Sequence, residues 1–241
     1  MVQGGAAGSL TALRRYKPKK VHGFFVGFVL VFVTIVLAGF SRRFFLAVAN
    51  GTFDHPPRVH IHAAFFFGWT ILLVIQVALA ATGRLRVHRK IGRWGAWLIL
   101  PMLITGSIVA ARDTQHDFAT DGEAAISFFY GELADLAAFG LLAGAAFWFR
   151  DRPEWHKRLI LLSCLALMGA AVGRIPEVAG YGAAILLTMI LSVFGYDLAA
   201  RREFHPATLC GAILLLTLTF TQIAVGNTQA WLSFAHRWLA I

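Results

Sequence analysis

Long apolar runs constrain the fold of this chain more than any other feature of its sequence. A helix needs about 20 predominantly apolar residues to cross a bilayer, and seven runs approach or exceed that length. They are 21–41, 58–81, 91–111, 124–149, 157–176, 179–198 and 206–227. The runs are continuous rather than alternating, which favours helices over a membrane β-barrel. The sequence therefore predicts an all-α, polytopic membrane protein with seven transmembrane helices.

The distribution of basic residues predicts the orientation of these helices. Lysine and arginine outnumber the acidic residues by 22 to 12, which gives a formal net charge of +10. Sixteen of the 22 cations fall in alternate connections, in the segments 1–20, 84–93, 150–158 and 201–202. Cytoplasmic loops carry such an excess, so we expect a cytoplasmic N-terminus and an external C-terminus. The charge then reports topology, and we expect no nucleic-acid partner.

A single membrane domain, 21–227, is expected, with a short segment at each end. Residues 1–20 lack the features of a cleaved signal peptide and are predicted to be a basic cytoplasmic arm. Residues 228–241 place two tryptophans on one helical face. They are predicted to be either an interfacial helix at the outer surface or an extension of the seventh helix. The expected partner is the lipid bilayer, and the oligomeric state stays open.

Ionisable residues inside membrane helices are costly and are therefore candidates for function. Glu132 and Asp135 are three residues apart, so they lie on one face of the fourth predicted helix. Two such carboxylates either share a compensating cation or keep one proton. Arg174 has a similar predicted depth and the right charge. The expected proton-relay or ligand pocket, in the outer half of the bundle, consists of His62, Gln76, Glu132, Asp135 and Arg174.

A structural role for the same residues is the alternative. His62 and Gln76 recur on a stripe with a seven-residue period, which is typical of a helix that faces its neighbours in a left-handed bundle. Both side chains can form hydrogen bonds across such a bundle. Arg174 and Asp135 can likewise form an ion pair that ties two helices together.

Two matching boxes occur at the cytoplasmic boundary, one at the start of the third predicted helix and one at the start of the fifth. Each is a histidine followed by two cations and an aliphatic residue, which indicates a weak internal repeat. Helix N-termini with adjacent cations attract anions, including lipid headgroups. The expected headgroup site consists of His88, Arg89, His156, Lys157 and Arg158. Alternatively, these long side chains only mark the membrane boundary.

The sequence also bears on cofactors. A retinal pigment is excluded because all the lysines lie in predicted arms or loops. A metal site has no support from an HxxxH or HExxH motif. A b-type haem needs histidines that face one another, and only His62 has the required depth. On the cytoplasmic side, cations surround His88, and they suit haem propionates better than haem iron. Haem b or a metal ion is therefore an alternative and not the favoured prediction.

Several short motifs are shared with a known family. The matching positions are His60, His62, Gln76, Gly83, Arg84, His88, Arg89, Gly92, Arg93, His156, Lys157, Arg158, Leu159, Arg174, Pro176, His205 and Pro206. In these positions the chain resembles a family of uncharacterised bacterial multi-pass membrane proteins with a Gln…His-Arg-x-x-Gly box and a His-Lys-Arg-Leu…Arg-x-Pro box. The resemblance implies a bacterial inner-membrane protein with His88 and His156 as family positions, and it implies no established activity. The His-Arg box is also similar to that of haem-binding membrane reductases.

The functional hypotheses that follow belong to different classes. The favoured one is a proton-coupled carrier or small-ligand-binding membrane protein. In it, Glu132 and Asp135 exchange protons, Arg174 controls their charge, and His62 relays protons or contacts the ligand. One alternative is a haem- or metal-dependent membrane oxidoreductase. Another is an enzyme or binder of anionic lipid headgroups at the cytoplasmic face. A non-catalytic bundle that binds a partner is a further hypothesis.

Overall fold

The computed structural model describes residues 18–241, with side chains from Gly23 onward. The described part is all-helical, with no strands. Its elements are α1 (Pro18–Phe40), η1 (Ser41–Leu46), α2 (Ala47–Ala49), α3 (Pro57–Ala81), α4 (Leu85–Asp121), α5 (Glu123–Trp148), α6 (Pro153–Ala166), α7 (Met168–Val172), η2 (Ala179–Tyr181), α8 (Gly182–Arg201), α9 (Pro206–Val225) and α10 (Gln229–Leu239). The basic arm expected at 1–20 lies outside the described residues, except for its last three, which begin α1.

Short connections set the order of the helices. Prolines begin α3, α6 and α9, where a helix tolerates a residue without an N–H group. Gly83 and Gly122 link α3 to α4 and α4 to α5, and both have positive φ angles, of 76° and 56°. An L-amino acid with a side chain rarely adopts that conformation. These tight turns make α3, α4 and α5 successive antiparallel neighbours.

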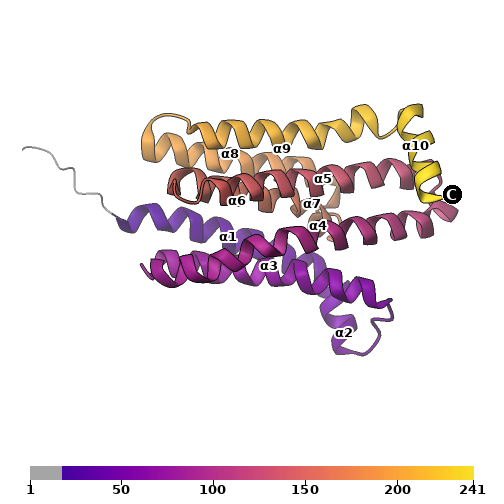
Figure 1. Cartoon of the computed structure of the whole chain (residues 1–241), viewed down its shortest axis with the longest axis horizontal. Helices are drawn as coiled ribbons and strands as arrows, with labels where there is room; N and C mark the ends of the chain where they lie inside the picture. The colour runs from indigo at the N-terminus through magenta and orange to yellow at the C-terminus, as the bar shows by residue number, and fades with distance from the viewer. Residues whose placement is uncertain (1–17) are drawn as a thin grey trace, which may run out of the picture.

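The helix α5 lies at the centre of the bundle (Figure 1), where it packs against α4, α6 and α9. Its buried face is rich in small residues, including Ala134, Ala138 and Ala143. Small residues allow membrane helices to approach closely. On the far side of α6, α1 packs against α3 and α7. The core is therefore built around α5 and α6 and not at the periphery.

Six helical segments within the described residues are long and apolar enough to cross a membrane. The expected run 157–176 is not one of them. It forms α6, of 14 residues, and α7, of five residues, with an interruption at Leu167. Residues 161–166 of α6 are all buried, so α6 is enclosed by other helices. The fold confirms a polytopic helical protein, while the seventh span and the orientation of the termini stay predictions.

The helix α10 is separate from α9 and turns across the end of the bundle (Figure 1). Its side-chain and main-chain groups bind the α4–α5 hairpin. Trp231 Nε1 donates to the carbonyl of Ile126 (3.0 Å), and Gln115 Nε2 donates to the carbonyl of Leu239 (2.6 Å). The face formed by Leu232, Ala235 and Leu239 is buried. The C-terminal segment therefore closes the bundle at the end opposite His88.

Candidate functional site

The rings of His88 and His156 face each other across the interface between the starts of α4 and α6. Each histidine is the fourth residue of its helix, so the matching boxes in the sequence occupy equivalent positions. The ring centroids are 6.4 Å apart, and the ring planes are nearly perpendicular, at 86°. The two histidines of the expected headgroup site therefore lie next to each other.

Main-chain carbonyls hold both rings by the same nitrogen. His156 Nδ1 lies 2.8 Å from the carbonyl oxygen of Ala146, and His88 Nδ1 lies 3.1 Å from that of Gln76. Each carbonyl belongs to the helix that precedes the histidine, so the hairpins α3–α4 and α5–α6 repeat one arrangement. A ring that donates from Nδ1 keeps a lone pair on Nε2. When both rings donate from Nδ1, both Nε2 atoms are potential ligands.

Gln76 explains the Gln…His-Arg-x-x-Gly spacing. In the amide orientation that satisfies its neighbours, Gln76 Nε2 donates to the carbonyl of His88 (3.0 Å), and Oε1 accepts from the N–H of Gly92 (3.1 Å). Nε2 also donates to His88 Nδ1 (2.7 Å) when that ring carries its proton on Nε2 and not on Nδ1. A Cβ atom at position 92 would lie only 3.3 Å from the nearest atom of the Gln76 amide group. Gln76 is therefore a brace for His88, and glycine at position 92 makes room for it.

This location removes Gln76 from the expected outer pocket. Gln76 and His62 are on the same helix, but 14 residues of α-helix span about 21 Å. The seven-residue period correctly indicates a shared face of α3. It does not place the two side chains at the same depth.

Most cations of the expected headgroup site have protein partners. Arg158 is fully buried and bonds to Asp197 through Nε (2.8 Å) and Nη2, and to Glu154 through Nη1 (2.6 Å). Lys157 binds Glu154 (2.7 Å) and lies over the ring of Phe25. Arg89 is exposed. Burial and these partners keep the side chain of Arg158 from reaching a lipid headgroup.

Asp197 is the buried charge that the sequence analysis missed. It accepts hydrogen bonds from Arg158, from the main-chain N–H of His205 (3.0 Å) and from Thr208 Oγ1 (2.6 Å). The residue lies one turn inside the end of α8, beside Arg201 and Arg202, so its position suggested a solvated helix end. In the structure it lies on the buried face of α8, in line with Ile190 and Val193, but α8 is apolar all round, so the sequence does not single out this face.

The outer cluster contains His62, Glu132, Asp135 and Arg174. Glu132 has Arg174, Asp113 and Asp135 within electrostatic range. Arg174 donates to the carbonyl of Ala170 and lies over the ring of Phe40 (4.8 Å from the centroid). No ion pair within 4 Å joins Arg174 to Glu132 or Asp135 in the described chain. The expected residues are neighbours here, but they form no direct salt bridge.

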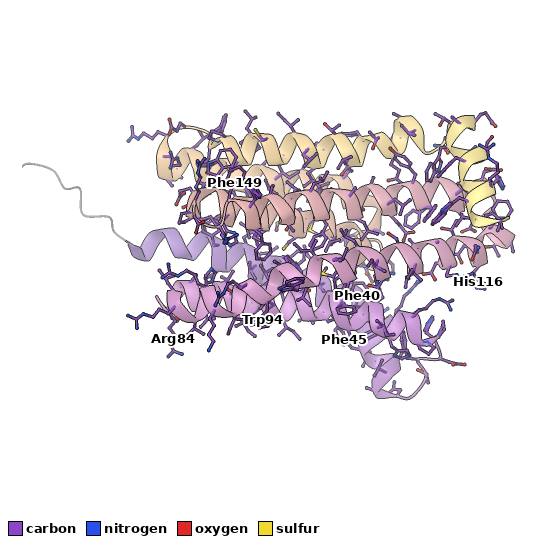
Figure 2. The ribbon with its side chains drawn as sticks, viewed as in Figure 1. Phe40, Phe45, Arg84, Trp94, His116 and Phe149 are labelled. Carbon is purple, nitrogen blue, oxygen red and sulfur yellow. The ribbon has the colours of Figure 1, made fainter. Side chains whose placement is uncertain are left out.

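Two details place this cluster in the fold. A Cβ atom at Gly169 of α7 would lie 3.7 Å from Asp135 Oδ2, so α7 passes beside Asp135. Phe40, and with it Arg174, lies between Arg84 and His116 along the bundle (Figure 2). His62 Nδ1 is buried without a hydrogen-bond partner among the described residues. The cluster therefore contains an unsatisfied polar atom near the end of α7.

No group of three or more His, Cys, Asp or Glu side chains within residues 18–241 is arranged to hold a metal ion. A metal at the His88–His156 pair therefore has two ligands from this part of the chain. A metal ion therefore fits the His88–His156 pair only if it needs two ligands or belongs to a cofactor that supplies the other ligands.

Comparison with known proteins gives no family. No family model matches the chain, and neither a curated protein nor a solved structure matches it. The fold and the apolar helices define the class, a multi-pass helical protein that contacts lipid. The particular activity is inferred below from the site alone.

Proposed function

We propose that this protein binds a b-type haem, with His88 and His156 as axial ligands, and takes part in one-electron transfer at the membrane. The proposal rests on one observation, the perpendicular pair of rings with centroids 6.4 Å apart. It adopts the oxidoreductase alternative of the sequence analysis in preference to the carrier.

The separation of the rings supports a shared metal ion. With metal–nitrogen bonds of about 2.0 Å and about 1.1 Å from a ring nitrogen to the ring centre, two imidazoles on opposite sides of one metal have centroids about 6.2 Å apart. The observed separation of 6.4 Å is close to this value. The carbonyls of Gln76 and Ala146 lie at hydrogen-bond distance from Nδ1 of the two rings, and metal-ligating histidines commonly donate their other N–H to such a carbonyl.

The number of ligands favours haem over a bare ion. His88 and His156 would hold the iron of a haem, which brings its other ligands with it. The bound group supplies reversible one-electron oxidation and reduction. The exposed cations Arg86, Arg89 and Lys90 lie on the same turns as His88, where they can pair with the propionates. A haem site at the membrane boundary explains why cations surround His88.

The test is an absorption spectrum of the purified protein, oxidised and then reduced with dithionite, after expression with added haem precursor. We expect a Soret band and a sharp α band in the reduced protein, at one haem per chain. His88→Ala and His156→Ala should each lose these bands. His116→Ala is the matched control, because His116 lies near the opposite end of α4 (Figure 2). Absence of the bands, or bands that survive both substitutions, would overturn the proposal.

Proton-coupled transport is the second candidate function, and the outer cluster supports it. The specific observation is the unpartnered Nδ1 of His62, with Arg174 within electrostatic range of both His62 and Glu132. Glu132→Gln and Asp135→Asn should each lower proton flux in liposomes, whereas Glu203→Gln, an exposed residue of another connection, should not. Unchanged flux in both variants would leave the cluster with a structural role.

The orientation follows from charge. We infer that the His88–His156 site faces the cytoplasm of a bacterium, because the basic connections lie at this end of the bundle. Reporter fusions to the two termini test this inference. A cytoplasmic signal from the C-terminus would contradict it.

A further inference from the structure

We propose that a groove between α4 and α10 binds one anionic phospholipid, with an acyl chain along α4 and the phosphate at Arg112. The groove has a volume of about 710 Å³, within the range of about 300–1,000 Å³ that is typical of small-molecule sites. Its walls include Leu103, Ile104, Ile108 and Trp238. The site is independent of the His88–His156 pair, from which Leu103 is separated by about 22 Å of helix.

The length of the groove matches one leaflet. Its lining residues on α4 run from Leu103 to Gln115, and these 12 steps span about 18 Å. One leaflet contributes about 15 Å of hydrocarbon. The apolar walls lie toward Leu103, and the polar residues Arg112 and Gln115 lie at the other end. A lipid placed with its chain toward Leu103 therefore brings its headgroup to Arg112.

Hydrogen bonds hold the Arg112 guanidinium in a position where it can bind an anion. Its Nη1 donates to Gln115 Oε1 (3.0 Å), and Gln115 Nε2 donates to the carbonyl of Leu239 (2.6 Å). This chain of hydrogen bonds connects the guanidinium to α10. Arg112 forms no ion pair with a described residue, so its remaining donors are free for a phosphate. A guanidinium matches phosphate geometry with two parallel hydrogen bonds.

The rim of the groove also fits the membrane interface. Trp238 is 56% exposed beside the groove, and tryptophan is enriched where hydrocarbon meets headgroups. Charge complementarity selects among lipids, because a zwitterionic headgroup offers the groove no net negative charge. The occupant is therefore an anionic lipid, such as phosphatidylglycerol.

The test is native mass spectrometry of the full chain released from nanodiscs that contain equal amounts of phosphatidylglycerol and phosphatidylcholine. We expect one retained phosphatidylglycerol and a preference that Arg112→Gln lowers about fivefold, the effect of one cation near an anionic surface. Ile108→Trp should fill the groove and lower retention of both lipids. Arg58→Gln is the control, because Arg58 is an exposed guanidinium at the start of α3.

The results of this experiment distinguish a site for an anionic lipid from an unselective apolar groove. Equal retention of the two lipids by the unsubstituted protein would show an unselective apolar groove and overturn the proposal. An unchanged preference in Arg112→Gln, or an equal loss in Arg58→Gln, would also overturn it. Circular dichroism of each variant verifies that the helices are intact.

Discussion

Arg158 and Asp197 form an ion pair in which both side chains are completely buried. The pair joins α6 to α8 across 39 residues of sequence. Glu154, Thr208 and the N–H of His205 complete the hydrogen bonds of the two charges. A network this fully satisfied stabilises one relative placement of α6, α8 and the start of α9.

Removing one member of this pair should strongly destabilise the protein. We expect Asp197→Ala to lower the free energy of unfolding by about 3–5 kcal/mol, because Arg158 then loses its buried partner and keeps only the partly exposed Glu154. The control, Glu203→Ala, removes the exposed partner of Arg201 and should cost at most about 1 kcal/mol. Unfolding in mixed detergent, followed by circular dichroism, measures both. Equal effects would contradict the assignment.

The contact between α1 and α7 depends on Gly39. A Cβ atom there would collide with the carbonyl group of Ala171, whereas one at Gly27 would have no atom within 4 Å. We expect Gly39→Ala to destabilise the protein by about 1–3 kcal/mol, a typical cost of overpacking. Gly27→Ala, on the same helix, should be neutral or slightly stabilising. Thermal unfolding of the two variants is the measurement, and similar midpoints would refute the close contact.

The docking of α10 should depend on pH through His236. Hydrogen bonds to Glu123 (2.8 Å) and to the carbonyl of Ile241 (2.9 Å) raise the pKa of His236 above its usual value. The protonated ring donates to both acceptors. The stabilisation is therefore complete below pH about 6.5 and is lost as the pH rises through the raised pKa.

The emission of Trp231 and Trp238 reports this docking. We expect the pH-dependent change in the stability of α10 to disappear in His236→Gln and to persist in His116→Gln. A pH profile that is the same in His236→Gln and in the unsubstituted protein would rule out this histidine as the titrating group.

Gln76 should act as a positioning residue for His88. Because its amide braces the carbonyl of His88 and the N–H of Gly92, Gln76→Leu leaves the histidine in place but less constrained. We expect haem affinity to fall about 10- to 100-fold, a typical effect of removing a residue that hydrogen-bonds to a metal ligand, and the midpoint potential to shift. Gln222→Leu, on α9, is the control. Haem titration and redox titration distinguish this role from simple destabilisation.

Hydropathy predicted the apolar helices well, because a membrane span must be long and must satisfy its own backbone. It could not reveal the interruption at Leu167, since the residues around it are as apolar as those of an unbroken helix. The break at 173–178 was visible, because Arg174 and Pro176 interrupt the run.

The candidate site was predictable in its residues but not in its pairing. The boxes containing His88 and His156 stand out in the sequence, yet nothing in helix periodicity indicates that α4 and α6 meet at that end. Periodicity also grouped Gln76 with His62, because it reports the face of a helix and not the depth along it. Asp197 was missed because its partner, Arg158, lies on a different helix.

The buried ion pair has a consequence for how the chain is inserted into the membrane. The 14 residues of α6 span about 21 Å, less than the hydrocarbon thickness of about 30 Å, and they carry Arg158. Within α6, Arg158 pairs with Glu154, and its second partner, Asp197, comes only with α8. The hydrogen bonds that hold α6 in place are therefore complete only after α8 has been synthesised, so α6 reaches its final position later than its place in the chain suggests.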